Sequence, residues 1–292
     1  MVFAYLAISH LAVGFAAAAV GINGFTNLFT FGDSYTSIDF QVSGAQPNAS
    51  NPIGNPALPG VDTDNGYNWV GYLVTTYNDS LVLAYDFAVA GATVDSDIVP
   101  QYESSVRDFV QQVTEFQNHY SDSDIWNSSN SLFTSWFGIN DIINGYAPAN
   151  WSITANETVT QYFEEVQLLY DAGARNFVVF MVPPFWRAPK YLATNATTQE
   201  VQDTEKTLIG DLNDRYLARL AEFEEDNVDA SVWTLNTTTV FDLALDNPTA
   251  YGSPDATCYD GDGTSCLWWN DLHPGQAIQN LVAQAVKNIT SS

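Results

Sequence analysis

Five short apolar segments are spread along the chain, and they predict the strands of a buried sheet. They lie at residues 28–31, 81–88, 132–137, 176–182 and 231–235. The run at 176–182, NFVVFMV, is continuous rather than alternating, which is typical of strands covered on both faces, as in parallel sheets. We therefore expect a mostly parallel, five-stranded sheet.

The segments between these runs carry apolar residues at three- and four-residue spacing, which predicts helices. The clearest are 102–120 and 158–172, with a shorter candidate at 69–75. The capping-box pair Thr197 and Glu200 predicts the start of a long helix, and Pro274 fits the first turn of the last one. Strand and helix alternate throughout, so we expect an α/β protein: a three-layer α/β/α sandwich whose sites form at the carboxyl ends of the strands.

The charge balance narrows the class of partner. The chain has 292 residues, with 34 Asp and Glu against 8 Lys and Arg, and a formal net charge of −26. This large negative charge argues against nucleic acid and anionic membranes as partners, and it suits an enzyme that acts on a neutral substrate in acidic surroundings. Residues 21–292 are long enough for one large domain, which we expect.

The N-terminal segment and the glycosylation sequons indicate a secreted, extracellular protein. Residues 1–20 carry no Lys, Arg, Asp or Glu and predict a signal peptide, although no basic residue precedes the apolar region; an anchor helix is the alternative. Eight sequons predict N-linked glycans, at Asn48, Asn78, Asn127, Asn150, Asn156, Asn195, Asn236 and Asn288. In a secreted chain Cys258 and Cys266 are expected to form a disulfide, with two free thiols as the alternative.

Ser34 is the candidate nucleophile. It follows the apolar run 28–31 in the tripeptide Gly-Asp-Ser, where its hydroxyl is placed to point out of the sheet. The tripeptide alone favours an ordinary turn, because a nucleophilic serine also needs a base and an oxyanion hole. Of the three histidines, His10 belongs to the signal peptide and His119 to the face of a surface helix. His273 is left as the base, with a backbone-bonded histidine at a helix entry as the alternative.

Four blocks in order carry a family resemblance. They are FGDS at 31–34, the glycine Gly91 in AVAGATVD, GIND at 138–141 and LHP at 272–274. Together they resemble the SGNH/GDSL hydrolases. The whole pattern from Phe25 to about Gln276, with FTFGDSYT, DNGYNWVGYL and NDLHP, resembles fungal secreted acetylesterases of carbohydrate esterase family sixteen.

The resemblance implies a serine esterase that removes acetyl groups from plant cell-wall oligosaccharides without a cofactor or a metal. Ser34 would attack the ester carbonyl, and His273 would take its proton and later deliver it to the leaving sugar hydroxyl. The backbone N–H groups of Ser34 and Gly91, with the side-chain amide of Asn140, would form the oxyanion hole. A lipid esterase or lysophospholipase of the same fold and a non-catalytic carbohydrate-binding relative are the alternatives.

The sequence departs from the family at the acid position. The usual block is Asp-x-x-His, and Asn270 stands here in place of the aspartate, while Asp271 is only two residues before His273. Either Asp271 reaches the imidazole, or Asn270 or a backbone carbonyl orients the ring in a Ser-His dyad; the second is favoured. Trp268 and Trp269 are candidates for a wall on which a sugar stacks, with core packing as the equal alternative.

Overall fold

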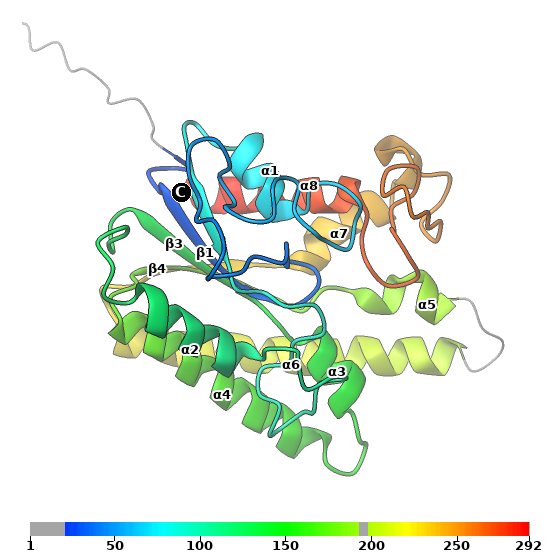
Figure 1. Cartoon of the computed structure of the whole chain (residues 1–292). Helices are drawn as coiled ribbons and strands as arrows, with labels where there is room; N and C mark the ends of the chain where they lie inside the picture. The colour runs from blue at the N-terminus through cyan, green and yellow to red at the C-terminus, as the bar shows by residue number, and fades with distance from the viewer. Residues whose placement is uncertain (1–20, 193–197, 292) are drawn as a thin grey trace, which may run out of the picture.

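A computed structural model describes residues 21–192 and 198–291, and it confirms the expected three-layer α/β fold. Its centre is one five-stranded sheet in the order β2-β1-β3-β4-β5, and every neighbouring pair is parallel (Figure 1). The strands are β1 Asn27–Gly32, β2 Leu83–Asp86, β3 Ser131–Trp136, β4 Asn176–Phe180 and β5 Ser231–Leu235. Because all strands run the same way, the loops that follow β1, β2 and β3 meet at one edge.

Helices cover both faces of this sheet. Helices α1, α7 and α8 lie on one face and α2, α4 and α6 on the other (Figure 1). The helices are α1 Trp69–Thr75, α2 Phe109–Tyr120, α3 Ile139–Gly145, α4 Trp151–Asp171, α5 Pro189–Leu192, α6 Thr198–Asp226, α7 Thr237–Leu245 and α8 Gln276–Ile289, with short 3-10 turns η1 Phe185–Arg187 and η2 Pro248–Tyr251.

Several predicted helix boundaries were wrong. Helix α2 begins at Phe109 rather than near residue 102, because Asp108 forms a capping box with Gln111. Helix α4 begins seven residues before the predicted position, at Trp151. The last helix begins at Gln276, so Pro274 lies before its first turn. Thr197, half of the other predicted capping box, lies outside the described residues, as does the predicted signal peptide.

The core is built around β1, whose side chains are buried along the whole strand. Phe29 stacks between Phe133 of β3 and Tyr85 of β2, with ring centroids 4.9 Å apart in both pairs. The buried apolar residues form a single cluster that extends from Ile22 to Val286. In the part of the chain that the structure describes, no helix has the length and hydropathy needed to cross a membrane.

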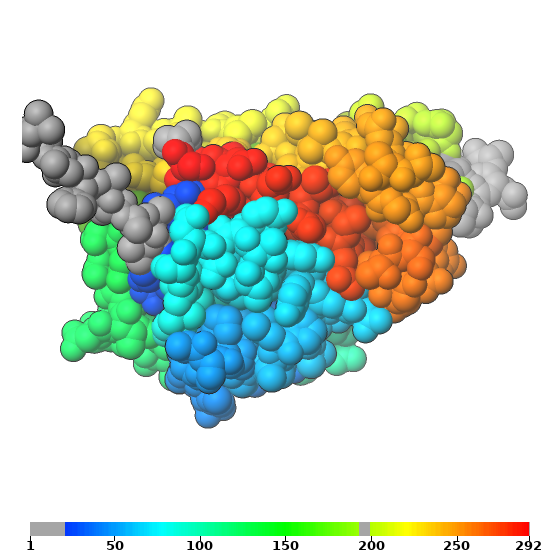
Figure 2. Space-filling model, turned by 90° about the horizontal axis from the view of Figure 1, so that it is seen from above, coloured from blue at the N-terminus to red at the C-terminus, as the bar shows by residue number. Residues whose placement is uncertain are grey.

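The long loop between β1 and α1 packs against the segment that precedes α8. Figure 2 shows residues of about 40–75, in blue to cyan, beside helix α8 in red and the 250–270 segment in orange. The Asn65 side-chain amide donates to the Gly261 carbonyl at 3.1 Å, and the Gln276 N–H donates to the Gly263 carbonyl at 2.9 Å. The first and last loops of the domain are therefore held together over one end of the sheet.

Five buried carboxyl groups have a raised pKa. Burial is the main cause: it raises the pKa of Asp33, Asp86, Asp141 and Glu165 each to about 7, and that of Asp64, beside Asp62, to about 9. Each group therefore keeps a proton in the folded chain at pH values where the unfolded chain has released it. The free energy of unfolding must then fall as the pH rises from about 4 to about 7. His273 contributes to the pH dependence in the opposite direction, because burial lowers its pKa. Its contribution is that of a single proton and is smaller than that of the carboxyl groups together.

We predict that the protein is more stable at pH 5 than at pH 8, as measured by denaturant unfolding. Glu165→Gln removes one buried titrating group and should flatten the dependence by up to roughly 1.4 kcal/mol per pH unit over that interval. Glu157→Gln, at an exposed position on the same helix α4, is the matched control and should keep the wild-type slope. Stability that rises toward pH 8 would contradict the protonated state of these carboxyls.

Candidate active site

Ser34 lies in a turn that starts where β1 ends. The Asp33 carboxylate accepts the Tyr35 N–H at 2.9 Å, and the Asp33 carbonyl accepts the N–H groups of Thr36 and Ser37. From α2, the Gln112 side chain donates to the Gly32 carbonyl at 2.9 Å and accepts the Gly32 N–H at 3.0 Å. This turn, residues 32–37, is called the nucleophile turn below. It is held by its own hydrogen bonds and by a neighbouring helix, and it leaves Ser34 half-buried at the sheet edge.

His273 comes from the opposite end of the chain to meet Ser34. Its Nε2 lies 2.9 Å from Ser34 Oγ, across a sequence separation of 239 residues. His119, the other described histidine, is an exposed residue on α2 whose Nδ1 lies 2.9 Å from the Glu115 carbonyl. The geometry therefore pairs the two residues that the sequence singles out, and it keeps His119 apart from them.

Asn270, and not Asp271, is the residue that contacts the far side of the imidazole. Asn270 Oδ1 accepts the N–H groups of Leu272 at 2.8 Å and His273 at 2.7 Å, and it lies 3.0 Å from His273 Nδ1. Two backbone donors fix which end of the amide is oxygen, so Nδ1 must donate. Nε2 is then left unprotonated toward Ser34, which is the tautomer that a general base requires.

Asp271 has a different environment. It is exposed, and its backbone carbonyl oxygen accepts the Lys190 N–H of α5 at 2.7 Å. It still affects His273 through space. Burial lowers the pKa of His273 to about 4, while the Asp271 charge acts in the raising direction and Lys190 in the lowering one. The imidazole is consequently neutral over most of the acidic range.

Two backbone donors lie free near Ser34. Among the described residues, neither the Ser34 N–H nor the Gly91 N–H donates to a protein acceptor. Gly91 has φ of +85°, in the left-handed region that favours glycine, and the Val89 N–H donates to the Gly32 carbonyl at 3.1 Å. That bond ties the Gly91 loop to the end of β1, beside the nucleophile turn.

Asn140 joins these two loops from the start of α3. Its Nδ2 donates to the Ala92 carbonyl at 3.0 Å and lies 3.4 Å from Asp33 Oδ2. One amide hydrogen is therefore committed to Ala92, whereas the contact with Asp33 is long and weak. Next to it, Asp141 Oδ1 accepts the Val94 N–H at 2.9 Å. The GIND block thus positions the loop that carries Gly91.

Two residues that the sequence did not single out hold the nucleophile in place. The hydroxyl of the buried Tyr35 donates to the Leu272 carbonyl at 2.6 Å. This bond links the nucleophile turn to residues 267–275, the loop that carries His273 and is called the histidine loop below. Thr63 Oγ1, in the long loop after β1, donates to the Ser34 carbonyl at 2.8 Å. Thr63 belongs to no sequence motif, and Tyr35 lies in the FTFGDSYT block without a role that the block alone assigns. Only their contacts in the folded chain identify them.

The two tryptophans differ in environment. Trp268 is 0% exposed and donates its indole N–H to the Ala256 carbonyl at 2.9 Å. It is a core residue, so for Trp268 the burial favours core packing, the second of the two alternatives left open by the sequence. Trp269 is half-buried, and its ring packs edge-on against His273 with centroids 6.1 Å apart. It lines a hollow of about 400 Å³ together with residues of the 59–66 loop.

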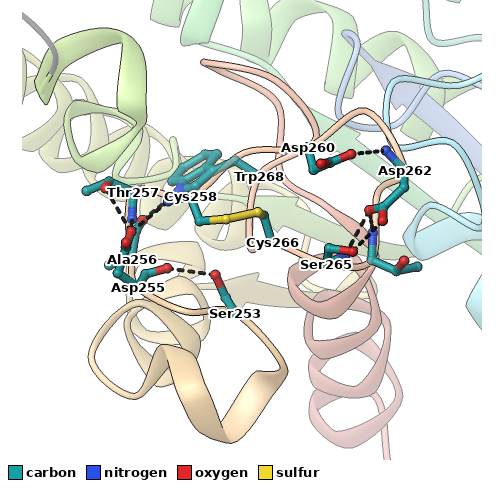
Figure 3. The surroundings of a disulfide bond; sticks show 11 residues. Ser253, Asp255, Ala256, Thr257, Cys258, Asp260, Asp262, Ser265, Cys266 and Trp268 are labelled. Carbon is teal, nitrogen blue, oxygen red and sulfur yellow. Dashed lines mark hydrogen bonds between the residues drawn. A yellow bond between two sulfur atoms is a disulfide. The ribbon is translucent and has the colours of Figure 1, made fainter.

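The loop before the histidine is closed by a disulfide between Cys258 and Cys266. Figure 3 shows this bond between two aspartate turns. Asp255 Oδ1 accepts the N–H of Cys258, and Asp262 Oδ1 accepts the N–H of Ser265, each at 2.8 Å. These bonds brace the segment that leads into Asn270 and His273. Within residues 21–192 and 198–291, no group of three or more His, Cys, Asp or Glu side chains is arranged to hold a metal ion.

Comparison with known proteins gives three findings. The family model of the GDSL-like lipase/acylhydrolases matches residues 28–286. An acetylesterase of Thermothelomyces thermophilus is 45% identical over 287 residues, which cover 96% of this chain and 94% of that protein. An acetylesterase of Hypocrea jecorina is 23% identical over 322 residues, covering 91% and 89% of the two chains.

Among solved structures, a member of the lipolytic G-D-S-L family from Veillonella parvula superposes with a TM-score of 0.49 at 11% identity. That superposition covers 90% of this chain and 97% of the other. The family match extends from β1 to α8 and so includes every strand of the sheet and both Ser34 and His273. The chain therefore belongs to the GDSL-like lipase/acylhydrolase family, and it is a carboxylic ester hydrolase.

Proposed function

We propose that this protein is a secreted serine esterase that hydrolyses acetyl esters on oligosaccharides derived from plant cell walls. The observation that carries the proposal is the hydrogen-bonded chain from Ser34 Oγ through His273 to Asn270 Oδ1, with contacts of 2.9 and 3.0 Å. Its acetyl specificity is supported by the similarity to the two fungal acetylesterases.

The reaction follows from this geometry in two stages. Ser34 Oγ attacks the acetyl carbonyl carbon while its proton passes to His273 Nε2. The tetrahedral intermediate then collapses, the bond to the sugar oxygen breaks, and that oxygen takes the proton from Nε2. Water then attacks the acetyl-serine carbonyl carbon while one of its protons passes to His273 Nε2. The bond from that carbon to Ser34 Oγ breaks, Oγ takes the proton back from Nε2, and acetate leaves.

The developing oxyanion needs donors that are in place before the reaction. The free N–H groups of Ser34 and Gly91 fit this role, and the weakly engaged second hydrogen of the Asn140 amide is the third donor. A donor of this kind is typically worth about 3 kcal/mol of transition-state stabilisation. Asp33, close to this amide, is protonated in acid because burial raises its pKa to about 7, so it places no negative charge beside the oxyanion there.

Asn270 orients the imidazole but supplies no charge for the imidazolium that forms during attack. Ester cleavage tolerates this arrangement, because an alkoxide is a better leaving group than an amine anion. The advantage of a neutral partner is that it does not raise the pKa of His273, which stays near 4. The base is therefore available in the acidic surroundings that the net charge of −26 suits.

Trp269 is the residue we assign to the sugar. In ester hydrolysis the leaving alcohol lies next to the general acid, and Trp269 packs against His273 at the edge of the hollow lined by the 59–66 loop. An aromatic face at that place suits stacking of a pyranose ring. Secretion is supported by the sequons, of which Asn48, Asn127, Asn150, Asn156, Asn236 and Asn288 are exposed, while Asn78 is half-buried and Asn195 lies outside the described residues.

We predict that ester hydrolysis depends on the Ser34 hydroxyl. Ser34→Ala should reduce ester hydrolysis to below about a hundredth of the wild-type rate with an unchanged circular dichroism spectrum, because the half-buried hydroxyl contributes little to packing. The wild type should cleave p-nitrophenyl acetate much faster than p-nitrophenyl palmitate, and it should release acetate from acetylated xylo-oligosaccharides. Preference for the palmitate ester would identify a lipid esterase instead.

We predict that catalysis depends on Asn270, the hydrogen-bond partner of His273, and not on Asp271. Asn270→Ala should lower kcat by about a hundredfold with little change in KM, because the ring loses its orienting acceptor. Asp271→Ala is the matched control at the neighbouring position, and it should leave kcat within about threefold of wild type. Asn270→Asp keeps the acceptor and adds a charge, so it should match or exceed wild-type activity at neutral pH. A collapse of activity in Asp271→Ala with an intact fold would show that the aspartate is the third member.

We predict that the pH dependence of kcat/KM follows the protonation of His273. His273 acts as a base only when it is neutral, so kcat/KM should fall as the pH drops through about 4 rather than through 6.5, the ordinary pKa of histidine. In Asn270→Asp the added carboxylate favours the imidazolium, and the acidic limb should move to higher pH. A wild-type limb near 6.5 would contradict a buried, desolvated His273 as the base.

A further inference from the structure

A second hollow lies beside the segment that leads into Gly91. It has a volume of about 410 Å³, within the range of small-molecule sites. The residues that line it come from three segments: the start of the loop that follows Ser34, including Gln41; the later part of that loop, including Asp62 and Thr63; and the chain from the end of β2 toward α2, including Ala90 and Tyr102.

This hollow adjoins the segments that carry the proposed reacting groups. Ala90 directly precedes Gly91, and Thr63 is the residue whose hydroxyl donates to the Ser34 carbonyl at 2.8 Å. The ring of Tyr102 lies over Gly91 so closely that a Cβ added to the glycine would be 2.1 Å from Tyr102 Cε1. A molecule in the hollow would therefore touch the same loop that offers its N–H to the oxyanion.

The lining selects one chemical class of occupant. Hydroxyl, amide, carboxylate and guanidinium groups alternate with the apolar faces of Phe40, Val61 and Tyr102. An acyl chain would leave these polar groups without partners, which is costly. An anion would meet two carboxylates, Asp39 and Asp62, and the one cation in the lining, Arg107, is already paired with Glu115 at 3.2 Å. A neutral polyhydroxylated molecule can satisfy donors and acceptors of both kinds while an aromatic ring covers its apolar face.

The hollow also adjoins the one beside Trp269. Val61 and Asp62 line both, so they form a ridge shared by two spaces of similar volume. Tyr102 lines only the first hollow and Trp269 only the second, and the two residues come from segments far apart in the sequence. The arrangement fits a ligand of at least two linked rings that crosses the ridge.

We propose that the hollow at Tyr102 is a second glycosyl subsite, which binds a neutral sugar unit linked to the acetylated unit at Trp269. The inference rests on the proposed function and deepens it, because it assigns a place in the structure to a second sugar unit of the oligosaccharide. Tyr102 is 65% exposed without ligand, and a stacked sugar would cover its ring. Gln41, Ser105 and Asp62 would supply hydrogen bonds to the sugar hydroxyls.

The test compares monoacetylated xylose, xylobiose and xylotriose as substrates, with acetate release as the readout. The wild type should show kcat/KM at least about tenfold higher for the disaccharide than for the monosaccharide, because binding in the second subsite contributes to the transition state. Tyr102→Ala should lower that disaccharide-to-monosaccharide ratio to within about threefold of one. Gln41→Ala, at a second exposed position in the lining, should lower the ratio in the same direction.

Tyr259→Ala is the matched control, since Tyr259 is 59% exposed and lies outside the linings of both hollows. It should keep the wild-type ratio. Equal kcat/KM for mono- and disaccharide in the wild type would overturn the subsite while leaving the proposed acetylesterase intact. Failure to release acetate from any saccharide, with p-nitrophenyl acetate still cleaved, would instead overturn the proposed function. If Tyr102→Ala alters the ratio of p-nitrophenyl butyrate to acetate but not the saccharide ratio, the hollow is an acyl pocket and the proposal is wrong.

Discussion

The contact between Ser34 Oγ and His273 Nε2 depends on holding together two turns from opposite ends of the chain. Tyr35 is central to this, because its hydroxyl donates to Leu272 in the histidine loop at 2.6 Å. From α8, Gln279 Nε2 lies 3.3 Å from the Tyr35 carbonyl and adds a second link. The turn that carries Ser34 is thus braced on the side from which His273 arrives, and a small displacement there would separate the two groups that we propose react together.

Burial determines the electrostatics of the site more than any ion pair. The same desolvation that lowers the pKa of His273 to about 4 raises that of Asp33 and of Asp141 to about 7. Between these values the His273 imidazole is neutral, and Asp33 and Asp141 are protonated. A charged aspartate at position 270 would have opposed this by favouring the imidazolium. Asn270 keeps the orientation of the ring without that effect, which fits the strongly acidic character of the chain.

The long loop between β1 and α1 contributes to the site in three ways. Thr63 holds the Ser34 carbonyl, Val61 and Asp62 separate the two hollows, and Asn65 binds the loop that precedes His273. Length and polarity in such a loop are therefore consistent with substrate recognition. The disulfide between Cys258 and Cys266 closes the segment that leads into the histidine loop, and it fixes the start of that loop in a similar way.

The sequence by itself determined the layered parallel sheet, because uninterrupted apolar runs and the periodic helices between them leave few other ways to bury so much hydrophobic surface. It also pointed to Ser34 and His273, since the strand-ending Gly-Asp-Ser and the small number of histidines leave few choices. The partner of His273 was decided only by tertiary structure. A two- or three-residue offset in an irregular loop does not specify which side chain faces a ring, and here two backbone N–H groups draw Asn270 inward and leave Asp271 exposed. The roles of Tyr35 and Thr63, the burial of Trp268 and the paired hollows likewise arise from contacts between distant segments, which local patterns do not encode.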